Sequence, residues 1–312
     1  MTGMASSSSV ALFSLLCFLS LFLPPNARTE TKFTIDAASS RIEVSVEAES
    51  PRLSDRQLKH WVQNAADAVV AYYGRYPVPH AFLQIRPFDG EGVRGGRTFS
   101  MHGGSIRIAV GNETTEDDLS TDWMLTHEMV HLTFPSMPDE HHWIEEGIAT
   151  YVEPIARIQA GQFDASRMWF ELVRDMPKGL PQEGDQGLDH THTWGRTYWG
   201  GALFCFLADV EIRRQTQNKK GLQDALRGIL NAGGDMREDW ELEKALQTGD
   251  RATGTDVLRK LYERMRNSPT ETDLDALWKE LGIREANGMV QFQDNAPLAA
   301  IRKSITAART DK

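Results

Sequence analysis

Two histidines four residues apart, His127 and His131, stand in the stretch LTHEMVHLTFPSMPDEHHWIEEGIATYVE, which runs from residue 125 to residue 153. On a helix this spacing places both imidazoles on one face, where they can bind a single tetrahedral metal ion. Glu128 lies beside them, where its carboxylate can face a water molecule rather than the metal. This HExxH pattern predicts a hydrolytic zinc site with Glu128 as its general base.

A zinc site with two histidines needs a third protein ligand and an open position for water or substrate. The stretch WIEEGIATYVEP, which follows a proline-broken loop, supplies carboxylates on a second predicted helix. We predict Glu146, immediately before Gly147, as the third ligand. Glu145, one residue away, points about 100° elsewhere around the helix and could support the site or face solvent. Thr150, one turn further on, either hydrogen-bonds a ligand's outer atom or is an ordinary helix residue. Pro154 should kink or end this helix, since proline removes a backbone donor.

Three motifs, in order along the chain, carry a family resemblance. HEMVH at residues 127–131, followed by WIEEGIA at residues 143–149, resembles the gluzincin zinc metallopeptidases, the thermolysin-like group that includes aminopeptidases. RTYWGGALFCFLADVEIRRQT at residues 196–216 resembles the helix that carries a zinc-facing tyrosine in these enzymes, especially in the glycyl aminopeptidase family. Tyr198 falls on the position of that tyrosine. The resemblance covers residues 125–230.

The resemblance implies an α+β, zincin-like metallopeptidase fold, with a small N-terminal lobe on a mixed sheet, a mainly helical C-terminal lobe and the active-site cleft between them. It implies one zinc ion (Zn2+) per chain, held by His127, His131 and Glu146, and hydrolysis of a peptide or protein substrate. Glu128 would take a proton from the attacking water and pass it to the leaving amine. Tyr198 would stabilise the oxyanion.

Two departures from the family pattern limit what the resemblance implies. Only residues 132–145 separate His131 from Glu146, fewer than is usual in the aminopeptidases, so a pocket wall can differ while the helices stay in place. The stretch RTFSMHGGSIRIAVG lacks the glutamate of the Gly-x-Met-Glu-Asn motif, which binds a substrate's free amine in those enzymes. Cleavage within chains is therefore as consistent with the sequence as trimming from the end. Glu153 matches a recurring acid in the family, and the alternative is a charge on the helix surface.

Other side chains near these motifs receive plainer interpretations. His141 and His142 stand in a loop beside two acidic residues, so we interpret them as solvated charge. His190 and His192 precede the tyrosine motif and could line the cleft and help to stabilise an oxyanion. Cys205 lies in the apolar run GGALFCFLADV and is therefore predicted to be a buried, unreactive thiol.

Hydrophobic periodicity predicts the elements that position these residues. Strict alternation of apolar and polar residues indicates strands, and steps of three and four residues indicate helices. The expected elements are strands at 41–47, 80–88 and 104–111, a helix within 54–76 capped by Ser54, one helix over 114–134, and a strand at 288–294. We predict a peptidase domain over 29–312, with an α/β lobe at 29–112 and a mainly helical lobe at 113–312 that carries the zinc site. If the strand at 104–111 lies at the sheet edge, an extended substrate could pair with it.

The first residues, 1–28, have the pattern of a targeting segment. VALFSLLCFLSLFL at residues 10–23 is apolar and uncharged, and it is shorter than the about 20 apolar residues of a transmembrane helix. We therefore predict a signal peptide, or alternatively a retained N-terminal anchor, and a secreted or periplasmic protein. A membrane partner is expected only if the segment is retained. Its removal would also remove Cys17 and leave Cys205 without a partner for an internal disulfide.

Composition and charge exclude several other classes of function. The 312 residues are 40% hydrophobic and 25% charged, as in an ordinary globular protein rather than a disordered or polytopic membrane protein. The formal net charge of -10 argues against nucleic-acid binding, because no basic stripe is present to neutralise phosphates. We predict a secreted zinc-dependent metallopeptidase. The alternative is a zincin-like binding module that has lost catalysis, with a structural or absent zinc.

Overall fold

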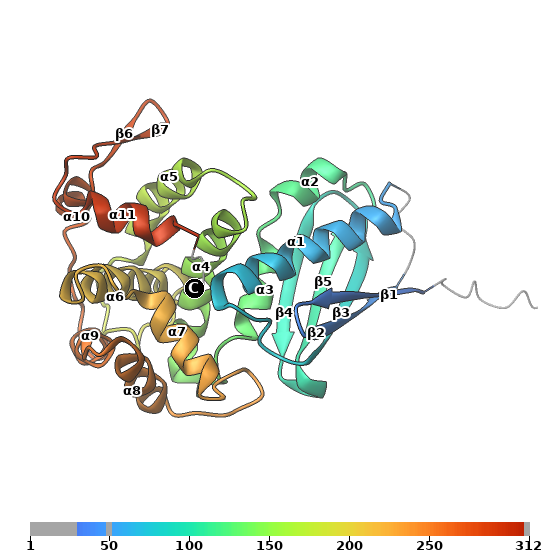
Figure 1. Ribbon diagram of the computed structural model, residues 1–312, viewed down its shortest axis with the longest axis horizontal. Helices are drawn as coiled ribbons and strands as arrows, with labels where there is room; N and C mark the ends of the chain where they lie inside the picture. Colours follow the sequence, from blue (N-terminus) through green and yellow to red (C-terminus); the bar gives the residue numbers. More distant parts are fainter. Residues whose placement is uncertain (1–29, 48–51, 309–312) are drawn as a thin grey trace, which may run out of the picture.

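The computed structural model describes residues 30–47 and 52–308. The targeting segment predicted at residues 1–28 lies outside the described residues. Within the described part of the chain, no helix is both long and apolar enough to cross a membrane. Figure 1 shows a sheet with one long helix lying across it, on the right, and a larger group of helices on the left. The prediction of an α+β fold, with a mixed sheet followed by a mainly helical region, is confirmed.

The N-terminal sheet has the strand order β1-β2-β3-β5-β4. Its strands are β1 (Thr31–Ala37), β2 (Ser40–Val46), β3 (His80–Phe88), β4 (Val93–Phe99) and β5 (Ser105–Gly111). The three inner strands are parallel, while β1 and β4 pair antiparallel at the two edges. Alternate residues of the inner strands, such as Val44 and Leu83, are buried in the hydrophobic core. The edge strand β4 lies beside α3, the helix of the HExxH motif (Figure 1).

Helix α1 (Asp55–Tyr73) lies within the predicted range and begins after Ser54, as predicted. Ser54 accepts a hydrogen bond from the Gln57 N–H in a reciprocal capping box, and Gly74 ends the helix with φ 79°, a left-handed conformation that glycine adopts at little cost. The apolar face of α1 is buried, and the helix contacts β1, α3 and α4. It therefore ties the sheet to the helical region.

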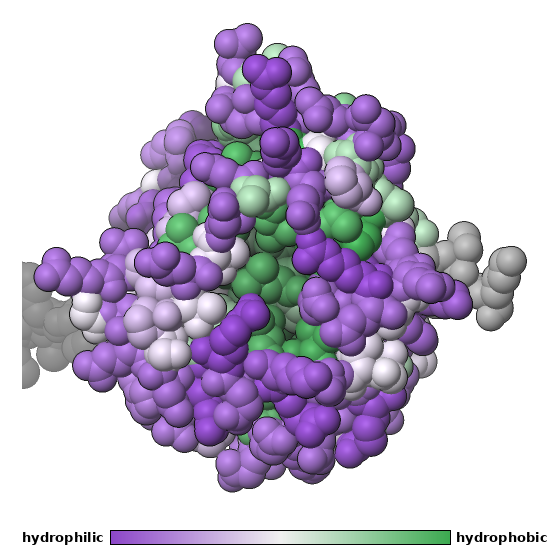
Figure 2. Space-filling model, turned by 90° about the vertical axis from the view of Figure 1, so that its left-hand side faces the viewer, coloured by the Kyte–Doolittle hydropathy of each residue, from purple (hydrophilic) through white to green (hydrophobic). Residues whose placement is uncertain are grey.

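The C-terminal region is mainly helical, and α4 lies near its centre. The helices are α2 (Glu116–Thr121), α3 (Met124–His131), α4 (His142–Gln159), α5 (Ala165–Asp175), α6 (Gly201–Gln215), α7 (Leu222–Asn231), α8 (Leu242–Thr253), α9 (Val257–Met265), α10 (Leu274–Leu281) and α11 (Ala299–Thr306). Short turns lie at η1 (Met101–Gly103), η2 (Asp139–His141) and η3 (Met176–Gly179), a π-helical segment η4 (Gly195–Gly200) precedes α6, and β6 (Ile283–Ala286) pairs with β7 (Met289–Phe292). α4 contacts α1, α3 and α6. The face of this region turned away from the sheet is largely polar, with apolar side chains visible in a central hollow (Figure 2).

The sequence predicted one helix over 114–134, and this prediction was wrong because the chain breaks between α2 and α3. Asp122 has extended backbone angles, φ −62° and ψ 133°. Its carboxylate accepts hydrogen bonds from the N–H groups of Met124 and Leu125, at 3.0 and 3.2 Å. Asp122 thus satisfies free N–H groups at the start of α3, which periodicity alone does not reveal.

The strand predictions missed β1 and β4. The suggestion that residues 104–111 form the sheet edge was therefore wrong. The glycine-rich stretch before β5 forms β4, whose register shifts between Arg94 and Arg97 around two glycines. β5 therefore pairs on both sides, with β3 and with β4. An extended substrate cannot pair with residues 104–111, and the edge strand beside the HExxH helix is β4.

Helix α4 continues through Pro154 to Gln159, so Pro154 does not end the helix, which was one of the two predicted outcomes. The residues on both sides, Val152 and Ile155 among them, are buried. Packing of these side chains stabilises the helix by more than the loss of one backbone hydrogen bond destabilises it.

Helices α4 and α6 touch backbone to backbone. A Cβ atom added at Gly201 would lie 2.0 Å from the Trp143 carbonyl oxygen and 2.7 Å from the Gly147 Cα. Gly201→Ala should therefore lower the free energy of unfolding by about 3 kcal/mol, since neither helix can move away without opening the core. Urea denaturation of the wild type and the variant measures this loss. Gln247→Ala, at an exposed position of α8, is the control and should change stability by less than about 0.5 kcal/mol. An equal effect of both substitutions would contradict the close packing.

Candidate metal centre

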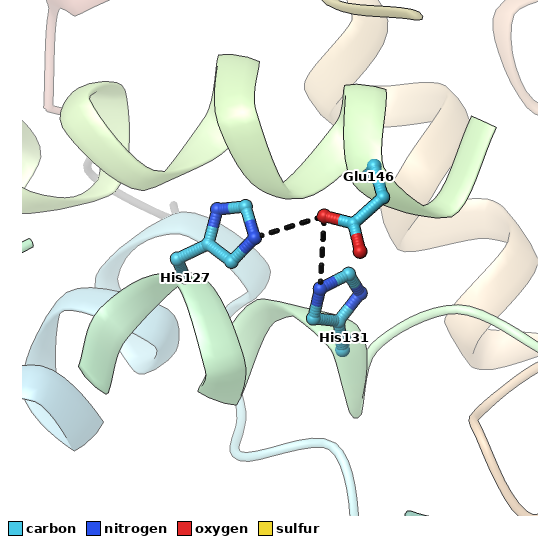
Figure 3. A group of neighbouring side chains, drawn as sticks. All are labelled: His127, His131 and Glu146. Carbon is cyan, nitrogen blue, oxygen red and sulfur yellow. Dashed lines mark hydrogen bonds and ion pairs between the residues drawn. The ribbon is translucent and has the colours of Figure 1, made fainter. Parts of the chain in front are cut away.

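Two helices bring three ligand-type side chains together. His127 and His131 project from one face of α3, with ring centroids 4.9 Å apart. Glu146 projects toward them from α4 (Figure 3). One ligand atom from each of the three lies within 4.8 Å of the other two, and His127 and Glu146 are buried. The predicted residues His127, His131 and Glu146 therefore converge, and in the described chain they are the group that could hold a metal ion.

The spacing of these atoms fits zinc. The Nε2 atoms of His127 and His131 lie 3.1 and 3.6 Å from the Glu146 Oε2 atom. Ligand atoms bound 2.0 to 2.2 Å from a tetrahedral zinc lie about 3.4 Å from one another. Two imidazole nitrogens and a carboxylate oxygen are also a usual donor set for a hydrolytic zinc site. A cavity of about 560 Å³ borders the three side chains and gives access to a fourth coordination position.

The charges of His127 and Glu146 favour metal binding, while the raised pKa of His131 means that a metal ion would compete with a proton for this imidazole. Burial lowers the pKa of His127, so this imidazole is neutral, which is the form that ligates a metal. Burial also acts to lower the pKa of His131, but contacts with the Glu146 and Glu128 carboxylates outweigh it and raise the pKa. For Glu146, burial acts to raise the pKa, and the histidines around it outweigh burial and hold the pKa far below its usual range. Glu146 is therefore an anion at neutral pH.

The carboxylate of Glu128 is buried between α3 and the edge strand β4. Its Oε2 atom accepts a hydrogen bond of 2.6 Å from the Thr98 hydroxyl. A Cβ atom added at Gly96 would lie 2.6 Å from the Glu128 Oε1 atom, so a glycine there lets the strand approach the carboxylate. Thr98 and Gly96 were not singled out from the sequence, because the strand that carries them was read as a loop.

Tyr198 lies on the π-helical segment η4 and faces the histidines. Its ring stacks on that of His127, with centroids 6.3 Å apart and planes at 16°. Burial, followed by the charges of Glu146 and Glu128, raises the pKa of Tyr198 to about 12. Its hydroxyl is therefore protonated near neutral pH and can donate a hydrogen bond. Arg196, fully buried, contacts Asp185 at 2.6 Å and donates to the Gly179 carbonyl oxygen at 2.5 Å, which anchors the segment.

Glu145 and Thr150, which lie near Glu146 on α4, do not join the three converging side chains. Glu145 accepts from the Met137 N–H at 3.4 Å and lies 3.3 Å from the His142 Nδ1 atom. It is not part of the converging group, as its position on the helix predicted. Thr150 is half-buried. The outer ring atom of His127, Nδ1, has no hydrogen-bond partner among the described residues, so Thr150 does not hydrogen-bond it.

Glu153 is buried rather than on the helix surface, so that alternative was wrong. It pairs with Arg157 at 3.0 Å, one turn further along α4. Burial raises the pKa of Glu153 to about 7 against the opposing charge of Arg157. Every residue from Tyr151 to Arg157 is buried, so this part of α4 has no solvent-facing side on which the carboxylate could be exposed.

The remaining histidines have distinct places. His141 is buried, with its Nε2 atom 3.0 Å from the Tyr262 hydroxyl, so the interpretation as solvated charge was wrong for it. His142 is half-exposed and its Nε2 atom lies 3.2 Å from the Glu146 Oε1 atom, while contacts with Glu145 and Glu146 raise its pKa to about 10. His190 and His192 are exposed and do not border the cavity beside the metal centre.

Cys205 is buried, as predicted, and burial raises the pKa of its thiol. A thiol that stays protonated is a poor nucleophile. Cys205, on α6, is therefore a packing residue of the hydrophobic core.

Comparison with known proteins supports the fold. No protein-family model matches the sequence, and no curated protein matches it. Among solved structures, the chain is similar to the aminopeptidase N family protein from Idiomarina loihiensis, with TM-score 0.61 and 14% identity over 81% of this chain and 49% of that one. It is also similar to the M1 zinc metallopeptidase from Deinococcus radiodurans, with TM-score 0.52 and 13% identity over 79% of this chain and 53% of that one. The chain thus spans about half the length of these proteins, and it has the fold that the M1 zinc metallopeptidase structures share.

Proposed function

We propose that this chain is a zinc-dependent peptidase that hydrolyses peptide bonds in a peptide or protein substrate. The observation that carries the proposal is the convergence of His127, His131 and Glu146 on one point, with the Glu128 carboxylate beside them at the wall of an open cavity. The shared fold with M1 zinc metallopeptidase structures supports it. One of the Deinococcus structures is of a mutant bound to a Tyr-Ser-Ala substrate.

His127, His131 and Glu146 would hold one zinc ion. That ion would supply Lewis acidity, polarising a peptide carbonyl and lowering the pKa of water from about 15.7 to about 7. Glu128 would take the proton of the attacking water and pass it to the leaving amine. The Thr98 hydroxyl, 2.6 Å from the Glu128 Oε2 atom, would hold the carboxylate in place for both transfers.

The edge strand β4 offers a place for the substrate backbone. Residues 96–101, at the end of β4 and just after it, border the same cavity as the ligands. An extended peptide could add to this edge as a further strand, with hydrogen bonds that do not depend on its sequence. We propose that β4, rather than residues 104–111, pairs with the substrate.

We further propose that residues 1–28 export the protein to the periplasm or the outside of the cell. The proposal rests on the apolar run at residues 10–23. N-terminal sequencing of the mature protein tests it. A start beyond residue 23 supports a cleaved signal peptide, and a retained run supports an anchor.

Metal analysis joined to a peptide-library digest tests the peptidase proposal. We expect about one zinc per chain, cleavage of library peptides and loss of cleavage on chelation, with recovery on adding zinc back. Bound zinc without any cleavage would instead favour a binding module. A protein that binds no zinc would contradict the metal centre itself.

Tyr198→Phe should lower kcat about 10²-fold to 10³-fold and change KM little. The tyrosine hydroxyl would donate to an oxygen that becomes negative only in the transition state, so its loss should affect kcat. The measurement is kcat on the best library peptide, with zinc quantified in the same samples. Tyr76→Phe is the control, because the Tyr76 hydroxyl is buried without a hydrogen-bond partner among the described residues. A loss below about threefold at full zinc occupancy would make Tyr198 a packing residue.

A further inference from the structure

A second cavity, of about 310 Å³, adjoins the metal centre. His127 and Tyr198 border both this cavity and the open one that contains Glu128, so the two cavities meet at these side chains. The rest of its wall comes from α4, α5 and the π-helical segment, and from residues outside them, namely Trp123, Phe163, Lys178 and Trp194. We call it the aromatic pocket, and we define it by Trp123, Phe163, Met168, Trp194 and Trp199. Its size is at the lower limit for ligand sites and fits one large side chain rather than a folded partner.

Two exposed indole rings flank the aromatic pocket at its border with the metal centre. Trp194 is 60% exposed and stacks on the Tyr198 ring, with centroids 5.7 Å apart. Trp123 is 50% exposed and lies edge-on to the His127 ring, with centroids 5.4 Å apart. Most other tryptophans of the described chain are buried. Large exposed aromatic side chains next to a cavity are typical of a surface that becomes covered by a ligand.

The charged side chains around the aromatic pocket are paired with one another. Arg157 pairs with Glu153 at 3.0 Å, Arg167 with Glu171 at 3.1 Å, and Asp175 with Arg174 at 2.5 Å and Lys178 at 2.8 Å. These pairs include every charged residue that borders this pocket in the described chain. Asp175 is shared by two cations, so the wall carries four cations and three carboxylates. No carboxylate is left to compensate a basic group inside the pocket, and the one excess cation is on a half-exposed side chain in contact with water. Burying a charged group in the pocket would therefore be costly.

We propose that the aromatic pocket binds a large apolar side chain, preferably an aromatic one, of the substrate residue next to the scissile bond. This inference rests on the proposed peptidase function and names the substrate class of the same site. A side chain in the pocket would contact aromatic rings that line it and would be removed from water. Full burial of a large apolar side chain corresponds to about 10-fold to 100-fold in affinity.

The test uses the zinc-loaded full-length protein and blocked peptides that differ only at the residues flanking the bond cut in the library digest. We expect kcat/KM for a peptide with Trp or Phe at one flanking position to exceed that of the Ala peptide by at least about tenfold, and to exceed those of the Asp and Lys peptides further. A preference for Ala, Asp or Lys at both flanking positions would overturn the inference while leaving the peptidase function intact.

Trp194 could bind the substrate side chain, or it could only hold the Tyr198 ring in place. The variant Trp194→Ala distinguishes these two roles. We expect kcat/KM to fall about tenfold or more on the aromatic peptide and less than threefold on the Ala peptide. Equal losses on both peptides would mean that Trp194 only supports Tyr198, and would overturn its role in the pocket. Phe82→Ala, which removes an exposed aromatic ring from the sheet, is the control and should leave both values unchanged.

Binding to the Glu128→Gln protein makes the inference independent of turnover. If no peptide is cleaved by the wild type, the peptidase proposal fails, and calorimetry with the same peptides still tests the pocket. Binding of the aromatic peptide at least about tenfold tighter than the Ala peptide, lost with Trp194→Ala, would support the pocket alone. Equal affinities for the two peptides would overturn it.

Discussion

Replacing His127 or His131 by Ala is expected to leave the purified protein without stoichiometric zinc and without peptidase activity. Two remaining protein ligands cannot hold a catalytic zinc tightly, and structural and catalytic zinc sites use at least three. Elemental analysis of dialysed protein measures the zinc, and digestion of the best library peptide measures the activity. Full zinc occupancy in either variant would contradict the ligand assignment.

The same experiment distinguishes the two adjacent glutamates of α4. Glu146 lies 3.1 Å from His127, whereas Glu145 contacts His142 and the Met137 N–H on another side of the helix. Glu146→Ala should therefore lose zinc, while Glu145→Ala, the matched control, should keep it. If Glu145→Ala empties the site and Glu146→Ala does not, the choice between the neighbours was wrong. Circular dichroism of each variant shows whether zinc is lost from a folded protein.

The placement of His127 and His131 could be predicted because it depends on local geometry, while the approach of Glu146 from a second helix was implied by the family resemblance. A four-residue spacing on a helix places two side chains on one face, whatever the rest of the chain does. The angle between successive helix residues means that Glu145 and Glu146 cannot both face the histidines, and the resemblance of the WIEEGIA motif pointed to Glu146. The α+β class followed from the change of period along the chain, from alternation in the first third to helical steps afterwards. The assignment of zinc and of catalytic roles to these residues remains a prediction.

Features that depend on contacts between distant segments could not be predicted. Thr98 reaches Glu128 only because a glycine-rich stretch forms an edge strand, and glycine is a poor signal for a strand. His141 looks solvated beside two acids in sequence, but Tyr262, more than a hundred residues away, covers it. Whether a polar residue is buried depends on packing that one segment of sequence does not determine.

The aromatic pocket illustrates the same limit at the level of function. Trp123, Phe163 and Trp194 are separated along the chain and stand in segments with no shared motif. Their meeting point is set by the packing of α3, α5 and the π-helical segment against α4. Substrate preference therefore depends on tertiary structure, even where the metal ligands can be recognised in the sequence.

Glu128→Gln is expected to keep zinc and lose between about 10²-fold and 10⁴-fold in kcat, the range that a general base contributes. Glutamine has nearly the same size, and its amide oxygen can still accept the hydrogen bond that Thr98 donates to Glu128 at 2.6 Å. The variant should thus fold like the wild type and bind peptide, but it cannot take a proton from water. Zinc content, melting temperature and kcat are measured on the same samples.

Two further variants make the result for Glu128→Gln specific. Glu243→Gln, an exposed position on α8, should leave kcat unchanged and controls for the loss of one negative charge. Thr98→Val removes the hydrogen bond to Glu128 but keeps the carboxylate, so its loss in kcat should be smaller than that of Glu128→Gln. Turnover by the zinc-loaded Glu128→Gln protein close to that of the wild type would rule out Glu128 as the base. The wild type could instead bind zinc and the aromatic peptide without cleaving any peptide. That result would favour a zincin-like binding module, in which Glu128 and Tyr198 line a binding site rather than perform catalysis.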